Sequence, residues 1–192
     1  MDTTEPLSKV LCSIDQRTSK LTVRAFASGL LSSFGHNPIL VARQIEGEIE
    51  FTPDQPESTS FEMKIKADSL EVTNQDLNSK DKGEIEQAMK REVLETSRYP
   101  EIVFASTRVT GQKVFDGQYR VMITGNLTLH GVTREQSITA NIRLIGEDLR
   151  AIGEFTVKQS DFRIKPVSAV GGALKVKDEL KISFEVVAHQ KK

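Results

Sequence analysis

Apolar and polar side chains alternate with a period of two along most of this chain. Between residues 45 and 51, Ile45, Ile49 and Phe51 share one phase, and three glutamates occupy the other. Successive side chains of a β-strand point to opposite faces, so this pattern is typical of a strand with one buried face. Further segments repeat the alternation, with the apolar phases Leu21, Val23, Ala25 and Ala27; Phe61, Met63, Ile65 and Ala67; Ile102 and Phe104; Val121, Ile123, Gly125, Leu127 and Leu129; Ile138, Ala140, Ile142 and Leu144; Phe155 and Val157; and Val176, Leu180, Ile182, Phe184, Val186 and Ala188. The sequence therefore predicts an all-β protein.

Short turn signals separate several of these segments. Asp116-Gly117 and His130-Gly131 each stand between two alternating runs, and such pairs favour two-residue hairpin turns with positive φ. Gly146-Glu147-Asp148 marks a third reversal of the chain. We therefore expect residues 102–157 to form an antiparallel meander of four strands.

One segment departs from the alternation. From Asp81 onward, Ile85, Met89 and Val93 recur every four residues, which is typical of one face of a helix. Asp81 and Glu84 resemble a capping box at its start. The sequence predicts one amphipathic helix over about residues 81–95, with its apolar stripe packed against the sheet. Docking of a partner on that stripe is the alternative.

Sequential antiparallel strands, about eight in number, leave edges that the fold must hide. Closure into an up-and-down barrel does this most simply, with a β-sandwich as the alternative. We assign residues 1–8 to an N-terminal tail and residues 9–189 to a single barrel domain, as the length of 192 residues suggests. An apolar piece predicts a short helical turn near residues 30–35, at one end of the barrel. Such a barrel is either filled by its side chains or holds one small ligand.

Composition and charge exclude several classes of protein. The longest apolar runs are far shorter than the roughly 18 residues that a membrane helix needs. The first 15 residues contain acids and Pro6 instead of a basic and apolar secretory leader, so we expect a cytoplasmic protein. A net charge of −1 argues against a nucleic-acid-binding protein. Cys12 is the single cysteine, which precludes an internal disulfide.

No motif in the sequence indicates catalysis or metal binding. His36, His130 and His189 are isolated from one another and from any cysteine pair, so no metal site is expected. His130 suits a hairpin turn, and His36 lies in a loop, with a contact at the barrel mouth as the alternative. A serine hydrolase would need a G-x-S-x-G turn, which does not occur. Ser160 and Asp161 are neighbours, and alternation sends neighbouring strand residues to opposite faces.

Five segments share their order and spacing with a known family. They are Ile14-Asp15 with Ser19 to Val23; Tyr99 to Phe104 with Ser106-Thr107; Gly125 to Thr133; Phe155 to Ile164; and Val176 to Ala188. Together they resemble the YceI-like, polyisoprenoid-binding family over about residues 9–189. The resemblance implies an extended lipocalin-like antiparallel barrel whose apolar interior holds a long isoprenoid chain, with no catalytic residues. Two positions differ from the family, because Thr18 stands where histidine is common and Arg163 replaces a frequent glycine.

The resemblance makes the apolar phases candidates for the lining of a lipid site. The candidates are Val23, Ile49, Phe51, Phe61, Met63, Ile65, Phe104, Val121, Ile123, Gly125, Leu127, Ile142, Phe155 and Phe184. His36, Arg163 and Lys165 are candidates for contact with a head group at the mouth of the barrel. Gly125 shares an inward phase, so we expect open space there that a larger side chain could occupy.

The leading hypothesis is a non-enzymatic protein that sequesters, stores or transports an isoprenoid lipid, such as a quinone or a polyprenyl phosphate. Its expected partner is this hydrophobic small molecule, with no cofactor besides it. One alternative is an enzyme for a small hydrophobic substrate, with His36 or Asp161 as acid or base. Another is a ligand-free interaction module that docks through the helix at residues 81–95. The sequence leaves the oligomeric state open, with a homodimer among the options.

Overall fold

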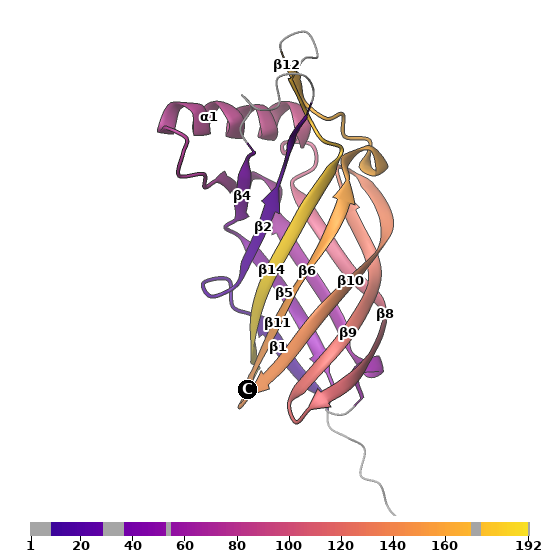
Figure 1. Cartoon of the computed structure of the whole chain (residues 1–192). Coiled ribbons are helices and arrows are strands. Elements are labelled where there is room, and N and C mark those ends of the chain that lie inside the picture. The colour runs from indigo at the N-terminus through magenta and orange to yellow at the C-terminus, as the bar shows by residue number, and fades with distance from the viewer. Residues whose placement is uncertain (1–8, 29–36, 53–54, 170–173, 192) are drawn as a thin grey trace, which may run out of the picture.

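Eight antiparallel strands close into a barrel in the computed structural model, which describes residues 9–28, 37–52, 55–169 and 174–191 (Figure 1). In order around the barrel they are β1 (Val10–Ile14), β5 (Ile45–Phe51), β6 (Ser60–Lys66), β8 (Glu101–Phe115), β9 (Gln118–Leu129), β10 (Val132–Ile145), β11 (Asp148–Lys158) and β14 (Glu179–Gln190). β14 returns to pair with β1, where Ile14 lies opposite Ala188. The predicted all-β barrel is confirmed, and closure leaves these eight strands without a free edge.

The middle of the chain forms the expected meander. β8 pairs with β9, β9 with β10, and β10 with β11, all antiparallel. Gly117, Gly131 and Gly146 occupy the three turns with φ values of +68°, +70° and +62°. This backbone conformation is unfavourable for residues with a Cβ, which explains the glycine in each turn. The predicted hairpins are therefore confirmed.

Shorter strands extend one end of the barrel. β2 (Lys20–Arg24) pairs with the first part of β14, and β4 (Ile39–Ala42) and β7 (Leu70–Val72) continue the sheet from β2. A small sheet of β3 (Ala27–Ser28), β13 (Leu174–Val176) and β12 (Ser168–Ala169) lies at the same end (Figure 1). Three 3₁₀ turns, η2 (Pro56–Ser58), η3 (Ala67–Ser69) and η5 (Gln159–Phe162), connect strands. The helical turn expected near residues 30–35 lies outside the described residues.

The predicted helix is present, and it begins earlier than its apolar spacing indicated. α1 (Ser79–Ala88) is followed directly by the π-helix η4 (Met89–Val93). The side chain of Asn78 caps α1 by accepting a hydrogen bond from Asp81 N at 2.9 Å, and its Nδ2 donates to Asp81 Oδ2. The expected capping box of Asp81 and Glu84 is therefore wrong. Asparagine has the short side-chain carbonyl that an N-cap requires, and Asp81 supplies the reciprocal acid three residues later.

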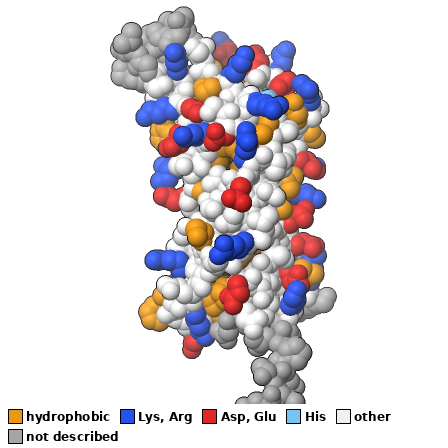
Figure 2. Space-filling model, turned by 90° about the vertical axis from the view of Figure 1, so that its right-hand side faces the viewer, with side chains coloured by type: hydrophobic (Ala, Val, Ile, Leu, Met, Phe, Trp, Pro, Cys, Tyr) orange, Lys and Arg blue, Asp and Glu red, His pale blue; other side chains and the backbone are white. Residues whose placement is uncertain are grey.

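Buried side chains fill the half of the barrel that lies away from α1. Phe51 and Tyr119 pack edge to face, with ring centroids 5.7 Å apart. Ala140 and Ala188 have no exposed surface, which is typical of a closely packed interior. On the outer face shown in Figure 2, acidic and basic side chains are interspersed, as the polar phase of the strands predicts. The space for a ligand therefore lies in the other half of the barrel.

Candidate binding pocket

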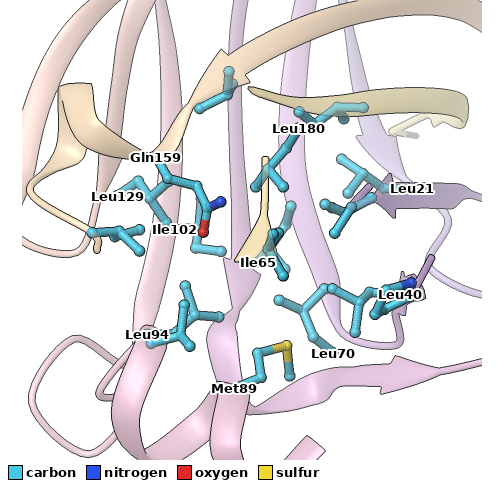
Figure 3. A pocket seen from close by; sticks show the side chains of 18 of the residues that line it. Leu21, Leu40, Ile65, Leu70, Met89, Leu94, Ile102, Leu129, Gln159 and Leu180 are labelled. Carbon is cyan, nitrogen blue, oxygen red and sulfur yellow. The ribbon is translucent and has the colours of Figure 1, made fainter. Parts of the chain in front are cut away.

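An apolar pocket with a volume of about 310 Å³ lies at the end of the barrel that α1 covers (Figure 3). The strands supply most of its wall through Leu21, Val23, Leu40, Met63, Ile65, Leu70, Ile102, Phe104, Leu127, Leu129, Leu180 and Ile182. Only one polar side chain, that of Gln159, belongs to the described lining. Partly open pockets of this size and apolar character are typical of small-molecule sites.

The helical segment forms one side of the pocket. Ile85, Met89 and Val93, the stripe seen in the sequence, line it together with Ala88 and Leu94. The stripe therefore packs over the open end of the barrel, as the packing interpretation predicted. The covering side chains are supplied by a local run of the chain, whereas the opposite walls come from strands far apart in the sequence.

A hydrogen bond ties this helix to the edge of the sheet. The Val72 N–H on β7 donates to Glu86 Oε1 at 2.7 Å. An edge strand leaves such groups unpaired, so the α1 carboxylate satisfies one of them and fixes the helix over the pocket. The following π-helical turn ends with Leu94 N donating to Met89 O at 2.8 Å. π-helical turns occur frequently at functional sites.

The sequence-based candidates divide between the pocket and the filled half. Val23, Met63, Ile65, Phe104 and Leu127 line the pocket. The other candidates do not: Ile49, Phe51, Val121, Ile123 and Ile142 are buried in the core, and Phe61, Phe155 and Phe184 are partly buried against it. Alternation correctly identified the inward faces of the strands that it predicted. It does not show where along the barrel axis an inward side chain lies, and this position decides whether the side chain lines the pocket.

The expectation of open space at Gly125 is wrong. A Cβ built on Gly125 would lie 2.5 Å from the Ala105 carbonyl oxygen and 2.6 Å from Phe104 Cζ. These distances are well inside van der Waals contact, so even a methyl group does not fit without movement of the β8 backbone. Gly125 is therefore a site of close strand approach, and it does not line the pocket.

Two of the candidates for the mouth of the barrel, Arg163 and Lys165, are not part of the described pocket lining. Arg163 and Lys165 are exposed, whereas Ile164 between them is buried and lines the pocket. Arg163 ends η5 with φ +58°, and its N–H donates to Ser160 O at 3.1 Å. A positive φ favours glycine, which accounts for glycine at this position in the family pattern. His36 lies outside the described residues.

Gln159, the polar side chain of the described lining, was not among the candidates predicted from the sequence. Its side chain is 4% exposed, and its Nε2 donates to Lys177 O at 2.9 Å. Its backbone N–H donates to Asp178 O at 2.9 Å, and its carbonyl accepts from Ile164 N at 3.0 Å. The available signal in the sequence was a glutamine that continues the apolar phase of Phe155 and Val157, but its hydrogen bond to Lys177 O is a tertiary contact.

Ser160 and Asp178 hold the η5 turn in place. Ser160 Oγ donates to Asp178 Oδ2 at 2.6 Å, and Ser160 N donates to Asp178 Oδ1 at 2.8 Å. These bonds, with the hydroxyl contributing most, hold the pKa of the Asp178 carboxyl below its ordinary value. Asp161, the candidate acid or base, is exposed and is not among the residues lining the pocket. The serine therefore has a structural partner, and the Ser160–Asp161 pair does not form a dyad.

His130 has the structural role that its turn suggested. It adopts φ +50°, its Nδ1–H donates to Phe162 O at 3.3 Å, and its Nε2 lies 2.7 Å from Glu95 Oε2. The Tyr99 ring packs on the imidazole with centroids 4.5 Å apart. His130 thus links the β9–β10 hairpin to the end of the helical segment and to η5.

The described residues contain neither a cluster of metal ligands nor a helix suited to spanning a membrane. There, no three or more His, Cys, Asp and Glu side chains are grouped so as to hold a metal ion. In the same part of the chain, no helix is both long enough and apolar enough to cross a membrane.

The described residues form a closed antiparallel barrel with an apolar pocket beside α1, which is the architecture of the lipocalin-like barrels. The YceI-like domain matches residues 13–188, and the chain belongs to this family. A UPF0312 protein of Pseudomonas syringae pv. syringae is 32% identical over 172 residues, which cover 85% of this chain and 81% of the relative. A UPF0312 protein of Azotobacter vinelandii is 32% identical over 126 residues, 64% of this chain and 58% of that protein.

Solved structures of low sequence identity share the fold. BcnA of Burkholderia cenocepacia superposes with a TM-score of 0.67 at 18% identity, covering 91% of this chain and 98% of BcnA. A polyisoprenoid binding domain from Saccharophagus degradans gives 0.66 at 13% identity, covering 95% and 99%. The Campylobacter jejuni YceI protein gives 0.60 at 19% identity, covering 80% and 85%.

Proposed function

We propose that this protein binds an isoprenoid or a related lipid in the pocket beneath α1 and carries or stores it without chemical change. The observation that carries the proposal is the contrast between the two halves of the barrel. One half is packed with buried side chains, whereas the other encloses about 310 Å³ with an apolar lining. An apolar cavity of this kind fills favourably with an apolar molecule, because burial contributes roughly 25 cal/mol per Å² of apolar surface.

The size of the pocket indicates how much of a ligand is enclosed. An engineered apolar cavity of about 150 Å³ in another protein binds benzene, so twice that volume suits roughly ten to fifteen carbon atoms. That range corresponds to two or three isoprene units. The Saccharophagus degradans domain, which has the same fold, is described as polyisoprenoid binding, and this supports an isoprenoid as the ligand.

Extraction of the purified protein tests the proposal. The full chain is purified from its native source without detergent and extracted with organic solvent, and the extract is analysed by mass spectrometry. We expect a prenyl lipid at a molar ratio near one. Repeated absence of any apolar small molecule from the extract would contradict the proposal.

A further inference from the structure

The pocket contains one hydrogen-bonding group whose orientation is determined by its neighbours. A backbone carbonyl only accepts hydrogen bonds, so the amide nitrogen of Gln159 must face Lys177 O, 2.9 Å away. The amide oxygen Oε1 then occupies the opposite side of the group. Figure 3 shows the Gln159 side chain directed into the space bounded by Leu129, Ile102 and Leu94. No described residue donates a hydrogen bond to this oxygen.

The described part of the lining contains no charged side chain. Apart from Gln159, the described side chains around the pocket are all apolar. The nearby bases Arg163 and Lys165 are exposed and do not belong to the lining. An anionic group inside the pocket would therefore lose its hydration without gaining an ion pair, which is strongly unfavourable.

We propose that the bound lipid carries a neutral hydroxyl group that donates a hydrogen bond to Gln159 Oε1. This inference rests on the proposed function and specifies the chemical class of its ligand. A prenyl alcohol or a hydroquinone supplies such a donor. A phosphate ester brings a charge that the pocket does not compensate, and a quinone or an ether presents only acceptors to an oxygen that is itself an acceptor.

Burial of a hydroxyl group is unfavourable unless the group forms a hydrogen bond. The bond to Gln159 Oε1 therefore determines whether the pocket prefers an alcohol to its ether. Methylation of the hydroxyl makes the ligand more hydrophobic, and apolar burial alone would favour the ether over the alcohol. A preference for the alcohol must therefore come from hydrogen bonding. We expect the alcohol to bind on the order of five- to tenfold more tightly than its methyl ether.

Competition binding with matched ligands tests this inference. The full-length, delipidated protein is loaded with the fluorescent probe N-phenyl-1-naphthylamine, which is displaced by farnesol, farnesyl methyl ether or farnesyl phosphate. These three ligands share one tail of three isoprene units and differ only at the polar end. Farnesol is expected to displace the probe at the lowest concentration, and farnesyl phosphate at the highest.

Two variants assign the preference to Gln159. Gln159→Leu replaces the amide acceptor with an apolar side chain of similar size. It should bring the ratio of the affinities for the alcohol and the ether to about one or below. Leu129→Met, a control in the same wall, should change both affinities together and leave the ratio unaltered. If Gln159→Leu does not fold, the three ligand affinities of the wild-type protein decide the question by themselves.

The outcomes separate this inference from the proposed function. Equal binding of the alcohol and the ether, or tight binding of the phosphate, by the wild-type protein would overturn the hydroxyl assignment while leaving a lipid-binding barrel. An unchanged ratio in Gln159→Leu would overturn it as well. Failure of all three ligands and of the probe to bind would instead count against the lipid-binding function itself.

Discussion

At the scale of single residues, Gly125 shows how closely two strands of the barrel approach each other. A Cβ at this position would lie 2.5 Å from Ala105 O and 2.6 Å from the Phe104 ring. We expect Gly125→Ala to lower the free energy of unfolding by about 1–3 kcal/mol, because the β8 backbone and a core aromatic must both move. Urea denaturation measures this change. Stability equal to that of the wild type would show that the strands separate readily at this point.

His189, near the end of β14, contacts Asp148 at the start of β11 and Asp15 just after β1. Its Nδ1 lies 2.6 Å from Asp148 Oδ1, and its Nε2 lies 3.3 Å from Asp15 Oδ2. The hydrogen bond to Asp148, followed by the one to Asp15, raises the pKa of the imidazole above its ordinary value of 6.5. Both carboxylates favour the protonated ring, so the contacts that His189 on β14 makes with Asp148 and Asp15 depend on pH.

The sign of this pH dependence follows from the direction of the shift. A pKa that is higher in the folded than in the unfolded state adds stability that is fully present below pH 6.5. This stability is lost as the pH rises through the folded-state pKa of His189. The imidazole resonances in an NMR titration should report the raised pKa, and denaturation across this pH range should show the loss. In His189→Gln this part of the pH dependence should disappear, whereas its persistence would assign it to another group.

At the scale of elements, α1 is the least firmly packed part of the pocket. None of its residues from Ser79 to Ala88 is buried, although Ile85 and Ala88 reach the pocket. Its connection to the sheet includes the hydrogen bond from Val72 N to Glu86 Oε1. Elements with few buried contacts open at lower free energy than the core, so we expect α1 to open more easily than the buried strands of the barrel.

Gly83 lies in the interior of this helix and limits its stability. A Cβ at residue 83 meets nothing within 4 Å. We expect Gly83→Ala to stabilise the helix by about 0.5–1 kcal/mol, because alanine loses less backbone entropy on helix formation. Slower hydrogen exchange of the α1 amides measures the effect locally, even if global unfolding is unchanged. Gly125→Ala, the same change in a crowded strand, provides the contrast, and faster exchange in Gly83→Ala would contradict the prediction.

At the scale of the whole molecule, the barrel combines a solid half with a hollow half, and the two can be tested separately. Leu129 lines the pocket, whereas Leu144 is partly buried near the opposite end, close to the Gly146 turn. Leu129→Trp should reduce lipid loading several-fold, because the indole takes up part of the 310 Å³. Leu144→Trp should leave the loading unchanged.

Loading is measured by mass spectrometry of solvent extracts from both variants. The natural chain has no tryptophan, so each variant also acquires a single indole fluorophore. The emission of Leu129→Trp should shift when lipid is removed, and that of Leu144→Trp should not. A similar loss of lipid in both variants would place the ligand throughout the barrel.

Most of the barrel strands, the meander and the helix were predictable from the sequence because each depends on local patterns, whereas β1 was not predicted. Alternation shows which side chains of a strand face inward, and Asp116-Gly117 and His130-Gly131 mark tight turns whatever surrounds them. The four-residue spacing of Ile85, Met89 and Val93 likewise requires only helical geometry. Local patterns are compatible with either a barrel or a β-sandwich. The five segments that match the family favoured the barrel.

Only the tertiary structure decided where the barrel is hollow and where it is filled. Phe51 and Leu127 both belong to inward phases, yet one packs against Tyr119 in the core and the other lines the pocket. A cavity is the space that side chains from many strands leave unfilled, and alternation within one strand does not predict where that space lies. The orientation of Gln159 depends on a carbonyl 18 residues away. Alternation in the sequence therefore determined the inward faces, and packing between distant strands determined the binding site.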